Sequence, residues 1–431
     1  METIIKIKLW DEDIAVLFWN KEKEVSVIEF LDSFIEKRID LAPLQMPIED
    51  MNRGVKIFSF PELRSKTFKG LPGLISDSLP DDYGNSVIEE WFSAKNISID
   101  ITPLDILCYI GKRGMGALEF EPAISENQLN ESSKIEIPEL VELANIVLNQ
   151  RTQFKTDIKY NNLNISDILK VGTSAGGAKP KAIIALNEKT GEVRSGQVKT
   201  SPDFTYWILK FDGLEGGKIK DNPLGIGRIE YAYYKMALDC SINISESRLL
   251  YDNERAHFMT KRFDRTSNGD KIHTQTWCAL AHYDRDERHS YEQLFQTMRQ
   301  MYLPMHDFEQ MYRRMVFNVI ARNHDDHTKN HSFIMDKTGN WSLAPAYDLC
   351  YSYSPSGFWT NKHQLSLNGK RDDFIKEDLL KVGYDMDIKN PKIIVEQIEQ
   401  CVSNFSFYAK EAGVSAQFSQ IIEKNIRKFV N

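Results

Sequence analysis

The sequence predicts an α+β protein with a β-rich N-terminal domain and a mostly α-helical C-terminal part. Apolar and charged residues alternate with a period of two in the first 20 residues, which is typical of half-buried strands. After residue 263 the apolar residues recur at three- and four-residue steps, which indicates helices. With 431 residues, of which 42% are hydrophobic, the chain is long enough for two or three domains with cores of their own.

The N-terminal domain is expected over residues 1–122. Strands at 4–10 and 14–19, joined by the acidic residues between them, form a predicted hairpin. A Gly- and Pro-containing stretch and a short helix follow, and the domain ends near Pro122. The GKRGMG segment at 111–116 is predicted to be a tight turn rather than an anion site, because a strand and not a helix follows it.

The next predicted unit, residues 123–263, begins with a polar connector that leads into a helix at 138–150. A small mixed sheet with one helix follows. Its expected elements are strands at 181–186 and 206–211, a helix at 227–239, and further strands up to residue 263.

The last predicted unit, residues 264–431, is mostly helical. Helices are expected at 290–301, 308–321, 376–382 and 391–403, with a final helix that ends in IIEKNIRKFV. In the second of these, one buried face is predicted for Phe308, Met311, Met315 and Val319. A hairpin follows at 331–349.

Charge and cysteine content exclude some classes of protein. The 62 acidic and 54 basic residues give a net charge of −8, so DNA contact must be local or through a partner. Five widely spaced cysteines fit neither a disulfide framework nor a zinc ribbon, which favours reduced thiols in a cytoplasmic protein. No leader and no membrane span are expected.

The densest polar cluster, NHDDHTKNH at 323–331, lies between the predicted buried helix and the hairpin. In kinase catalytic loops an aspartate takes the proton of the substrate hydroxyl, and an asparagine five residues later binds Mg²⁺. Asp325 and Asn330 have this spacing, and Asp348 lies where a second Mg²⁺ carboxylate is expected, after the returning strand. The sequence therefore predicts that these three residues meet, with Asp325 as the base.

A competing interpretation takes His324, His327 and His331, with the aspartates, as ligands of a zinc or iron centre. Against it, Asp325 and Asp326 are consecutive and would not both face one small ion without strain. We expect instead that His327 and His331 hydrogen-bond the loop backbone.

A strand, a Gly-rich turn and a second strand are predicted in VGTSAGGAKPKAIIAL, residues 171–186. Such a turn lets backbone N–H groups approach phosphates closely. It is not a Walker P-loop, because Ala178 precedes Lys179 and no Ser or Thr follows. Taken alone, an ordinary β-turn is the commoner explanation of two adjacent glycines.

Lys210 favours the interpretation of this turn as a phosphate-binding loop. It ends an apolar strand, where an ammonium is costly unless it meets a phosphate or carboxylate. Glu230 on the next helix is a candidate partner, as in kinases; a lysine that reaches solvent and a surface glutamate are the alternative. The order Gly-rich turn, Lys210, Glu230, Asp325 with Asn330, Asp348 is the order required for two-lobed phosphoryl transfer.

Together these segments resemble the HipA toxins, which are serine/threonine kinases of bacterial type II toxin–antitoxin systems. The resemblance covers nearly the whole chain. It implies a two-lobed, protein-kinase-like core, with an N-lobe in 123–263 and a helical C-lobe in 264–431. The segments that carry it are residues 68–84 and 111–122 for the N-terminal domain, 172–182 for the Gly-rich loop, 257–265 for the hinge, and 323–333 and 343–349 for the catalytic and metal-binding loops.

The resemblance implies that Asp325 is the catalytic aspartate and that Asn330 and Asp348 hold Mg²⁺. It also implies ATP-binding positions, namely Lys210, Gly176, Gly177, Ala178, Lys181, Glu230, Lys261 and Phe263.

Ser174, in the Gly-rich loop, is implied to be an autophosphorylation site. A phosphate there would repel those of ATP, which would make the reaction self-limiting. A plain turn residue is the alternative for Ser174. Lys261 departs from the glutamate that some relatives carry at the hinge, which leaves nucleotide selectivity open.

The resemblance further implies a small helix-turn-helix antitoxin similar to HipB, operator DNA bound mainly through that antitoxin, and a protein substrate. The best-known family substrates are aminoacyl-tRNA synthetases, whose phosphorylation arrests growth and is linked to persistence. We therefore expect an ATP- and Mg²⁺-dependent serine/threonine protein kinase. Two alternatives stay open, a non-catalytic co-repressor and a kinase of small molecules or lipids.

Overall fold

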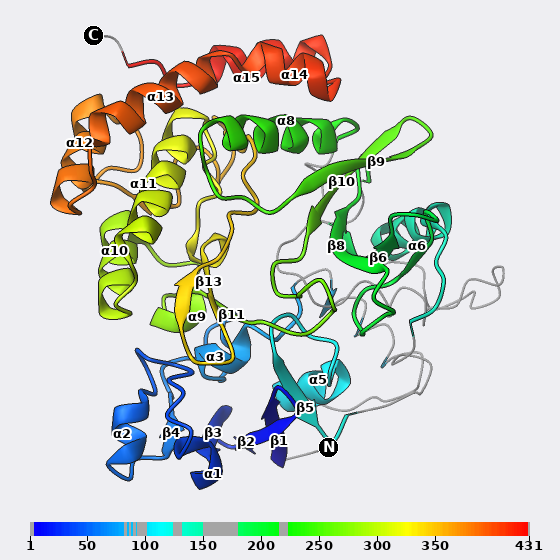
Figure 1. The fold of residues 1–431 in the computed structure, drawn as a ribbon, viewed down its shortest axis with the longest axis vertical. Helices are drawn as coiled ribbons and strands as arrows, with labels where there is room; N and C mark the ends of the chain where they lie inside the picture. Colours follow the sequence, from blue (N-terminus) through cyan, green and yellow to red (C-terminus); the bar gives the residue numbers. More distant parts are fainter. Residues whose placement is uncertain are drawn as a thin grey trace. The chain divides into compact units, whose positions relative to one another are not determined.

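The structure is a computed structural model that describes residues 4–81, 84–85, 88, 92, 101–123, 132–149, 180–214 and 223–429 (Figure 1). The chain forms two compact units. Unit 1 comprises Met1–Ala42, Met46–Gly227 and Arg248–Thr274, and unit 2 comprises Pro43–Gln45, Arg228–Ser247 and Gln275–Asn431. The three domains expected from the sequence, with boundaries after residues 122 and 263, stay a prediction.

The N-terminal part of unit 1 is an antiparallel sheet in the order β4-β3-β2-β1-β5. Alternate residues of β1 are buried, as the period of two predicts. The predicted hairpin is confirmed, but its turn is formed by Trp10 and Asp11, both with positive φ, so the second strand already begins at Glu12. The strands are β1 (Ile4–Leu9), β2 (Glu12–Asn20), β3 (Val25–Phe30), β4 (Ile57–Ser59) and β5 (Leu118–Glu121).

Short helices accompany this sheet. They are α1 (Asp32–Ile35), α2 (Ile48–Asn52), α3 (Gly73–Ser76) and α5 (Pro103–Ile110). Thr102 and Asp105 form a capping box at the start of α5, which explains where this helix begins. Residues 111–116 form a turn between α5 and β5, as predicted.

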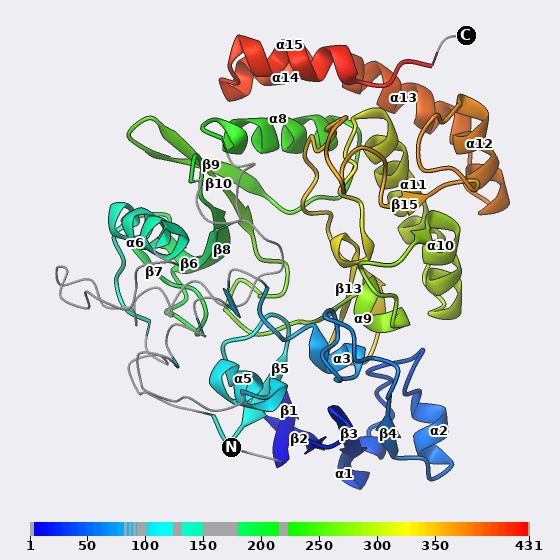
Figure 2. The same ribbon diagram turned by 180° about the vertical axis from the view of Figure 1, so that it is seen from behind.

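The second sheet of unit 1 has the order β7-β6-β8-β10-β9. A mixed sheet was expected, whereas the ladders β6–β7, β6–β8 and β8–β10 are antiparallel, because short turns such as the one between β6 and β7 reverse the chain. Trp207, Leu209 and Ile184 from the sheet pack with Leu140 and Val141 of α6, which lies beside β6 in both views (Figures 1 and 2). The elements are α6 (Ile137–Asn149), β6 (Lys181–Asn187), β7 (Val193–Ser195), β8 (Phe204–Lys210), β9 (Ser247–Asp252) and β10 (Arg255–Lys261).

Unit 2 is mostly helical, as predicted. Its helices are α8 (Ile226–Asp239), which enters the unit at Arg228, α9 (Trp277–Ala281), α10 (Tyr291–Gln300), α11 (Met305–Ile320), α12 (Lys376–Asp385), α13 (Pro391–Ser403), α14 (Phe405–Ala412) and α15 (Ala416–Asn425). Its short strands are β12 (His289–Ser290), β13 (Ser332–Met335), β14 (Trp341–Leu343) and β15 (Leu365–Ser366), and the strand β11 (His273–Thr276) enters the unit at Gln275.

The helix α11 forms the centre of unit 2. Phe308, Met311, Met315 and Val319 are buried, which confirms the predicted face, and the helix is also buried on other sides, for example at Phe317. A helix enclosed in this way is a rigid support for the loop that follows it.

The predicted final helix is wrong in its extent. The chain forms two helices, α14 and α15, and α15 ends at Asn425. The periodicity continues beyond this point, but the backbone N–H of Arg427 donates to the carbonyl of Ile320 at 3.0 Å, and its side chain binds Asp372. These contacts with the core hold the last residues in an extended conformation, which begins at Ile426.

None of the five cysteines, all of which lie in the described ranges, forms a disulfide bond. In the part of the chain that the structure describes, no helix combines the length and the apolar character needed to cross a membrane.

Candidate active site

The candidate catalytic loop lies between α11 and β13, as predicted. Arg322 leaves the helix with a φ of 58°, and residues 328–330 form a short 3₁₀ turn before β13 begins. The side-chain nitrogen Nδ2 of Asn330 donates a 2.6 Å hydrogen bond to the backbone carbonyl of Asp325. This bond closes the loop between the two residues whose spacing predicted their roles.

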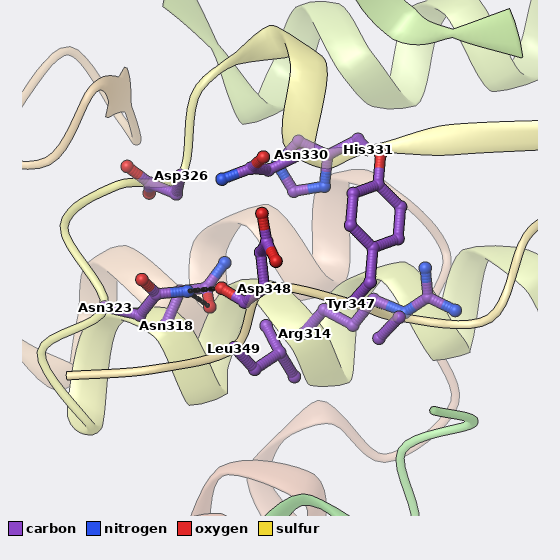
Figure 3. Close-up of a pocket in the computed structure, with 10 residues that line it drawn as sticks. Arg314, Asn318, Asn323, Asp326, Asn330, His331, Tyr347, Asp348 and Leu349 are labelled. Carbon is purple, nitrogen blue, oxygen red and sulfur yellow. Dashed lines mark hydrogen bonds between the residues drawn. The ribbon is translucent and has the colours of Figure 1, made fainter. Parts of the chain in front are cut away.

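Asn330 and Asp348 line the same pocket (Figure 3). Asp348 follows β14, and its φ of 53° belongs to the left-handed region, which is uncommon for residues other than glycine. Figure 3 shows the carboxylate of Asp348 pointing toward the side chain of Asn330. Because Nδ2 of Asn330 is bound to Asp325, the amide oxygen is the atom of Asn330 that remains to coordinate a cation.

Asp325 lies at the surface, with 53% of its side chain exposed, and does not line this pocket. Its backbone N–H donates to Oγ of Ser352 at 2.9 Å. Nε2 of His327 lies 3.7 Å from its carboxylate, and burial lowers the pKa of that imidazole, so the ring is neutral at pH 7. An exposed carboxylate with a neutral neighbour is accessible to an incoming hydroxyl group.

Asp326, in contrast, is 1% exposed and anchors the loop. Its carboxylate accepts hydrogen bonds from Oη of Tyr291 (2.7 Å), Nδ1 of His363 (2.8 Å) and the backbone N–H of Gln364 (2.7 Å). Burial alone would raise the pKa of Asp326, but His363 and these hydrogen bonds hold it below its ordinary value. The two consecutive aspartates therefore have different environments, as the argument against a shared ion requires.

Two asparagines that the sequence analysis did not select form a hydrogen-bonded chain that reaches the backbone of Asp348. Asn323 donates through Nδ2 to Oδ1 of Asn318 at 2.9 Å and to the backbone carbonyl of Asp348 at 3.4 Å. Asn318 in turn donates to Oη of Tyr291 at 3.0 Å. A signal for Asn318 exists in the sequence, because it is an amide beside Val319 on the apolar face of α11.

Arg314 was also missed. It lines the pocket, and its guanidinium donates to the carbonyl of Ala344 at 2.7 Å, just after β14. Burial lowers the pKa of Arg314 to about 10, so it remains charged at neutral pH. The contact fixes the backbone that leads to Asp348.

The three histidines of the loop, His324, His327 and His331, are not grouped as a metal centre. Nδ1 of His327 accepts from the N–H of Lys329 at 3.2 Å, which confirms one predicted backbone bond. The His324 ring lies 4.1 Å from that of His363, and burial lowers the pKa of His324 to about 3 and that of His331 to about 4. Across the described residues, no three or more His, Cys, Asp or Glu side chains are grouped to hold a metal ion, so the zinc or iron interpretation has no support there.

The predicted ATP-binding lysines lie in unit 1. Lys181 of β6 and Lys210 of β8 are direct partners in the β6–β8 ladder. Lys181 is buried and forms a 3.0 Å ion pair with the buried Asp81, a residue that the sequence analysis did not select. Nζ of Lys210 lies 5.6 Å from the centre of the Phe258 ring. The predicted pairing of Lys210 with Glu230 joins residues of different units and stays a prediction.

The predicted hinge, with Lys261 at the end of β10 and Phe263 after it, is held by its neighbours. The N–H of Arg262 donates to the carbonyl of Tyr206 at 2.9 Å. The guanidinium of Arg262 pairs with the fully buried Asp264 at 2.8 Å. This ion pair keeps the pKa of Asp264 well below its ordinary value in spite of burial.

Asp264 also explains the turn at 111–116. The N–H of Gly116 donates to the Asp264 carboxylate at 2.7 Å, and Arg265 donates to the carbonyls of Gly114 and Gly116. The backbone groups of this turn are therefore used within the protein. The predicted site residues Ser174, Gly176, Gly177 and Ala178 lie outside the described residues.

Comparisons with known proteins identify the family. The HipA N-terminal domain matches residues 5–121, and the HipA-like C-terminal domain matches residues 173–409. Among solved structures, HipA of Shewanella oneidensis MR-1, in complex with HipB and its operator DNA, matches with a TM-score of 0.66 and 16% identity over 99% of this chain and 97% of that one.

A second solved structure, the Helicobacter pylori proinflammatory kinase CtkA, has a TM-score of 0.32 and 11% identity over 51% of this chain and 92% of that one, which is too distant to support an argument. A comparison with curated protein sequences gave no match. The Shewanella structure supports a shared fold, and both family domains are matched in order along the sequence. The chain belongs to the HipA family.

Proposed function

We propose that this protein is an ATP- and Mg²⁺-dependent serine/threonine protein kinase, a HipA-type toxin that phosphorylates a host protein and so arrests growth. One observation carries the proposal. Asn330 and Asp348 line one pocket, and the side chain of Asn330 is hydrogen-bonded to the backbone carbonyl of Asp325, whose own carboxylate is exposed. An exposed carboxylate on the same loop as one of two oxygen ligands is compatible with phosphoryl transfer to a hydroxyl group.

The donor set fits Mg²⁺. This ion prefers oxygen ligands and usually takes one or two protein carboxylates, with water and substrate phosphates completing its coordination. The amide oxygen of Asn330 and the carboxylate of Asp348 provide two such ligands, and within the described ranges no larger His, Cys, Asp or Glu cluster competes with them. Bound Mg²⁺ would neutralise the charge that develops on the transferred phosphate.

The chain's own residues supply the other parts. Asp325 would accept the proton of the substrate hydroxyl group, which its exposed carboxylate can reach. The Asp326 anchor fixes the loop, so that Asp325 needs little reorganisation when a substrate arrives.

Two lysines support phosphate binding. Lys181 and Lys210 face each other across the ladder, so their side chains leave the same side of the sheet. Lys181 is already paired with Asp81 at 3.0 Å, and a bound phosphate would be a further anionic partner for the two ammonium groups. We propose that they contact the ATP phosphates together with Gly176, Gly177 and Ala178, and that the backbone at Lys261 and Phe263 binds adenine.

Regulation and partners follow from the family. We propose autophosphorylation of Ser174, an antitoxin similar to HipB, and operator DNA bound mainly through that antitoxin. The HipB and operator DNA named for the Shewanella structure support these partners, and the net charge of −8 supports DNA contact through the antitoxin. The proposed place of action is the cytoplasm, with an aminoacyl-tRNA synthetase as the first substrate to test.

One experiment separates this proposal from its alternatives. The protein is incubated with ATP, Mg²⁺ and a bacterial lysate, and phosphorylated sites are mapped. Phosphate on Ser174 and on one host protein supports the toxin kinase. The absence of any transferred phosphate supports the co-repressor, and labelled small molecules or lipids alone support the third function. Parallel assays with ATP and GTP test the selectivity that Lys261 leaves open.

A further inference from the structure

Residues 353–362, which we call the aromatic loop, connect the region after Asp348 to the buried His363. Two adjacent aromatic residues at its tip are exposed, Phe358 by 83% and Trp359 by 53%. Their ring centres are 4.9 Å apart, with an interplanar angle of 89°, which is a favourable edge-to-face arrangement. An exposed pair of this size adds little to the core and is typical of a recognition surface.

The aromatic loop is ordered by its own backbone. The N–H of Ser354 donates to the carbonyl of Thr360 at 3.2 Å, and the N–H of Gly357 donates to the carbonyl of Ser354 at 3.0 Å. A Cβ atom at Gly357 would lie 2.4 Å from Oγ1 of Thr360, so the tip is tightly folded. Nε2 of Gln364 also donates to the carbonyl of Trp359. The backbone that carries the pair is therefore ordered before any ligand binds, which lowers the entropic cost of binding.

Residues on both sides of the aromatic loop attach to the candidate catalytic loop. At the first end, Oγ of Ser352 accepts from the N–H of Asp325 at 2.9 Å. At the second end, the N–H of Gln364 donates to the Asp326 carboxylate at 2.7 Å and to the carbonyl of His324 at 3.2 Å. Phe358 follows Ser352 by six residues, so the chain cannot place it more than about 20 Å from this contact.

We propose that the aromatic loop is the docking surface for the polypeptide substrate, and that Phe358 and Trp359 bind an apolar side chain that flanks the acceptor serine or threonine. This inference rests on the proposed kinase function and adds a substrate preference to it. An extended peptide of about six residues can cover a separation of up to about 20 Å, which a small metabolite cannot. The docking surface therefore favours a protein as the substrate.

The charge of the aromatic loop favours a polypeptide over nucleic acid. Single-stranded nucleic acids also stack on aromatic rings, but they need a basic groove along their backbone. Lys362 is the one charged residue in the sequence of residues 353–362. An apolar side chain next to a hydroxyl-bearing residue is the partner that this surface matches.

The test uses the full-length protein with ATP, Mg²⁺ and a positional-scanning library of serine and threonine peptides. The wild type should prefer Leu, Met or Phe at a position near the acceptor. In the Phe358→Ala/Trp359→Ala variant this preference should fall by about tenfold or more. Tyr302→Ala is the matched control, because Tyr302 is 93% exposed outside the aromatic loop, and it should keep the wild-type preference.

A binding measurement separates docking from catalysis. Fluorescence anisotropy of the same labelled peptide pools with the Asp325→Asn variant, with and without the two alanine substitutions, requires no turnover. Apolar pools should bind about tenfold more weakly when Phe358 and Trp359 are replaced. If this loss is seen but the wild type transfers no phosphate, the docking surface stands and the kinase function fails.

Three results would overturn the docking surface. One is phosphate transfer without an apolar preference in the wild type. Another is a preference that survives the double alanine variant. The third is binding of a labelled oligothymidylate that depends on the two rings when peptide binding does not.

Discussion

Replacing Asp326 by asparagine should destabilise the protein far more than the same change at its neighbour Asp325. The two aspartates are adjacent in the sequence, but Asp326 is 1% exposed, whereas 53% of the Asp325 side chain is exposed. The substitution keeps the size of the side chain and removes its charge. The pair is therefore a matched comparison of a buried carboxylate with an exposed one.

The magnitude follows from the hydrogen bonds of Asp326. Its two oxygens accept from Tyr291, His363 and Gln364 at 2.7 to 2.8 Å. An asparagine amide has one oxygen, and its NH₂ group cannot accept, so at least one buried donor loses its acceptor. A lost bond to a charged group and a buried donor without a partner together cost about 3–5 kcal/mol. For Asp325→Asn we expect a change within about 0.5 kcal/mol.

The assay is urea unfolding of the full-length wild type, Asp326→Asn and Asp325→Asn, followed by tryptophan fluorescence at pH 7.5. The midpoint should fall clearly for Asp326→Asn and stay near the wild-type value for Asp325→Asn. Equal midpoints for all three proteins would refute the reasoning, because they would mean that the buried hydrogen bonds of Asp326 contribute nothing to stability.

Three further predictions follow from the same structure. Burial lowers the pKa of His324 from 6.5 to about 3, so between these pH values the unfolded chain binds more protons than the folded protein. Stability should therefore fall as the pH drops below 6.5, by about 2 kcal/mol at pH 5 from this residue. Urea unfolding at pH 5 and pH 7.5 should show a smaller loss of stability in His324→Phe than in the wild type. Lys181→Met removes the ammonium that lies 3.0 Å from the carboxylate of Asp81 and should cost about 3 kcal/mol in the free energy of unfolding. Adding Asp81→Asn should recover most of this loss, because no unpaired buried carboxylate then remains. A double variant as unstable as Lys181→Met would show that the loss does not come from the ion pair. Asp348→Asn should raise the Mg²⁺ concentration for half-maximal phosphate transfer at least about tenfold in a Mg²⁺ titration, and an unchanged titration would remove Asp348 from the metal site.

Local patterns predicted the first hairpin and the helix that precedes the candidate catalytic loop. The alternation of apolar and charged residues predicted the strands of the first hairpin, and the helical spacing of apolar residues predicted α11. Each of these signals lies within a single strand or helix. The spacing of Asp325 and Asn330 predicted that one loop carries both residues, and a hydrogen bond between them closes that loop. A separation of five residues along the chain is short enough for local geometry to bring the two residues together.

Contacts between distant residues were not predictable from such patterns. The partners of Asp326 come from α10 and from the segment at residues 363–364, and no local periodicity encodes their approach. The same holds for Asp81, which meets Lys181 a hundred residues later in the chain. The predicted end of the last helix was wrong for this reason too. The hydrogen bond from the backbone N–H of Arg427 to the carbonyl of Ile320 ends the helical pattern early.

The most direct test of the central claim is the rate of labelled phosphate transfer from ATP by the wild type and by Asp325→Asn, at saturating Mg²⁺. If Asp325 is the base, the variant should keep the wild-type unfolding midpoint and lose about 10²- to 10⁴-fold in rate. A variant that folds normally and transfers phosphate at the wild-type rate would contradict the account.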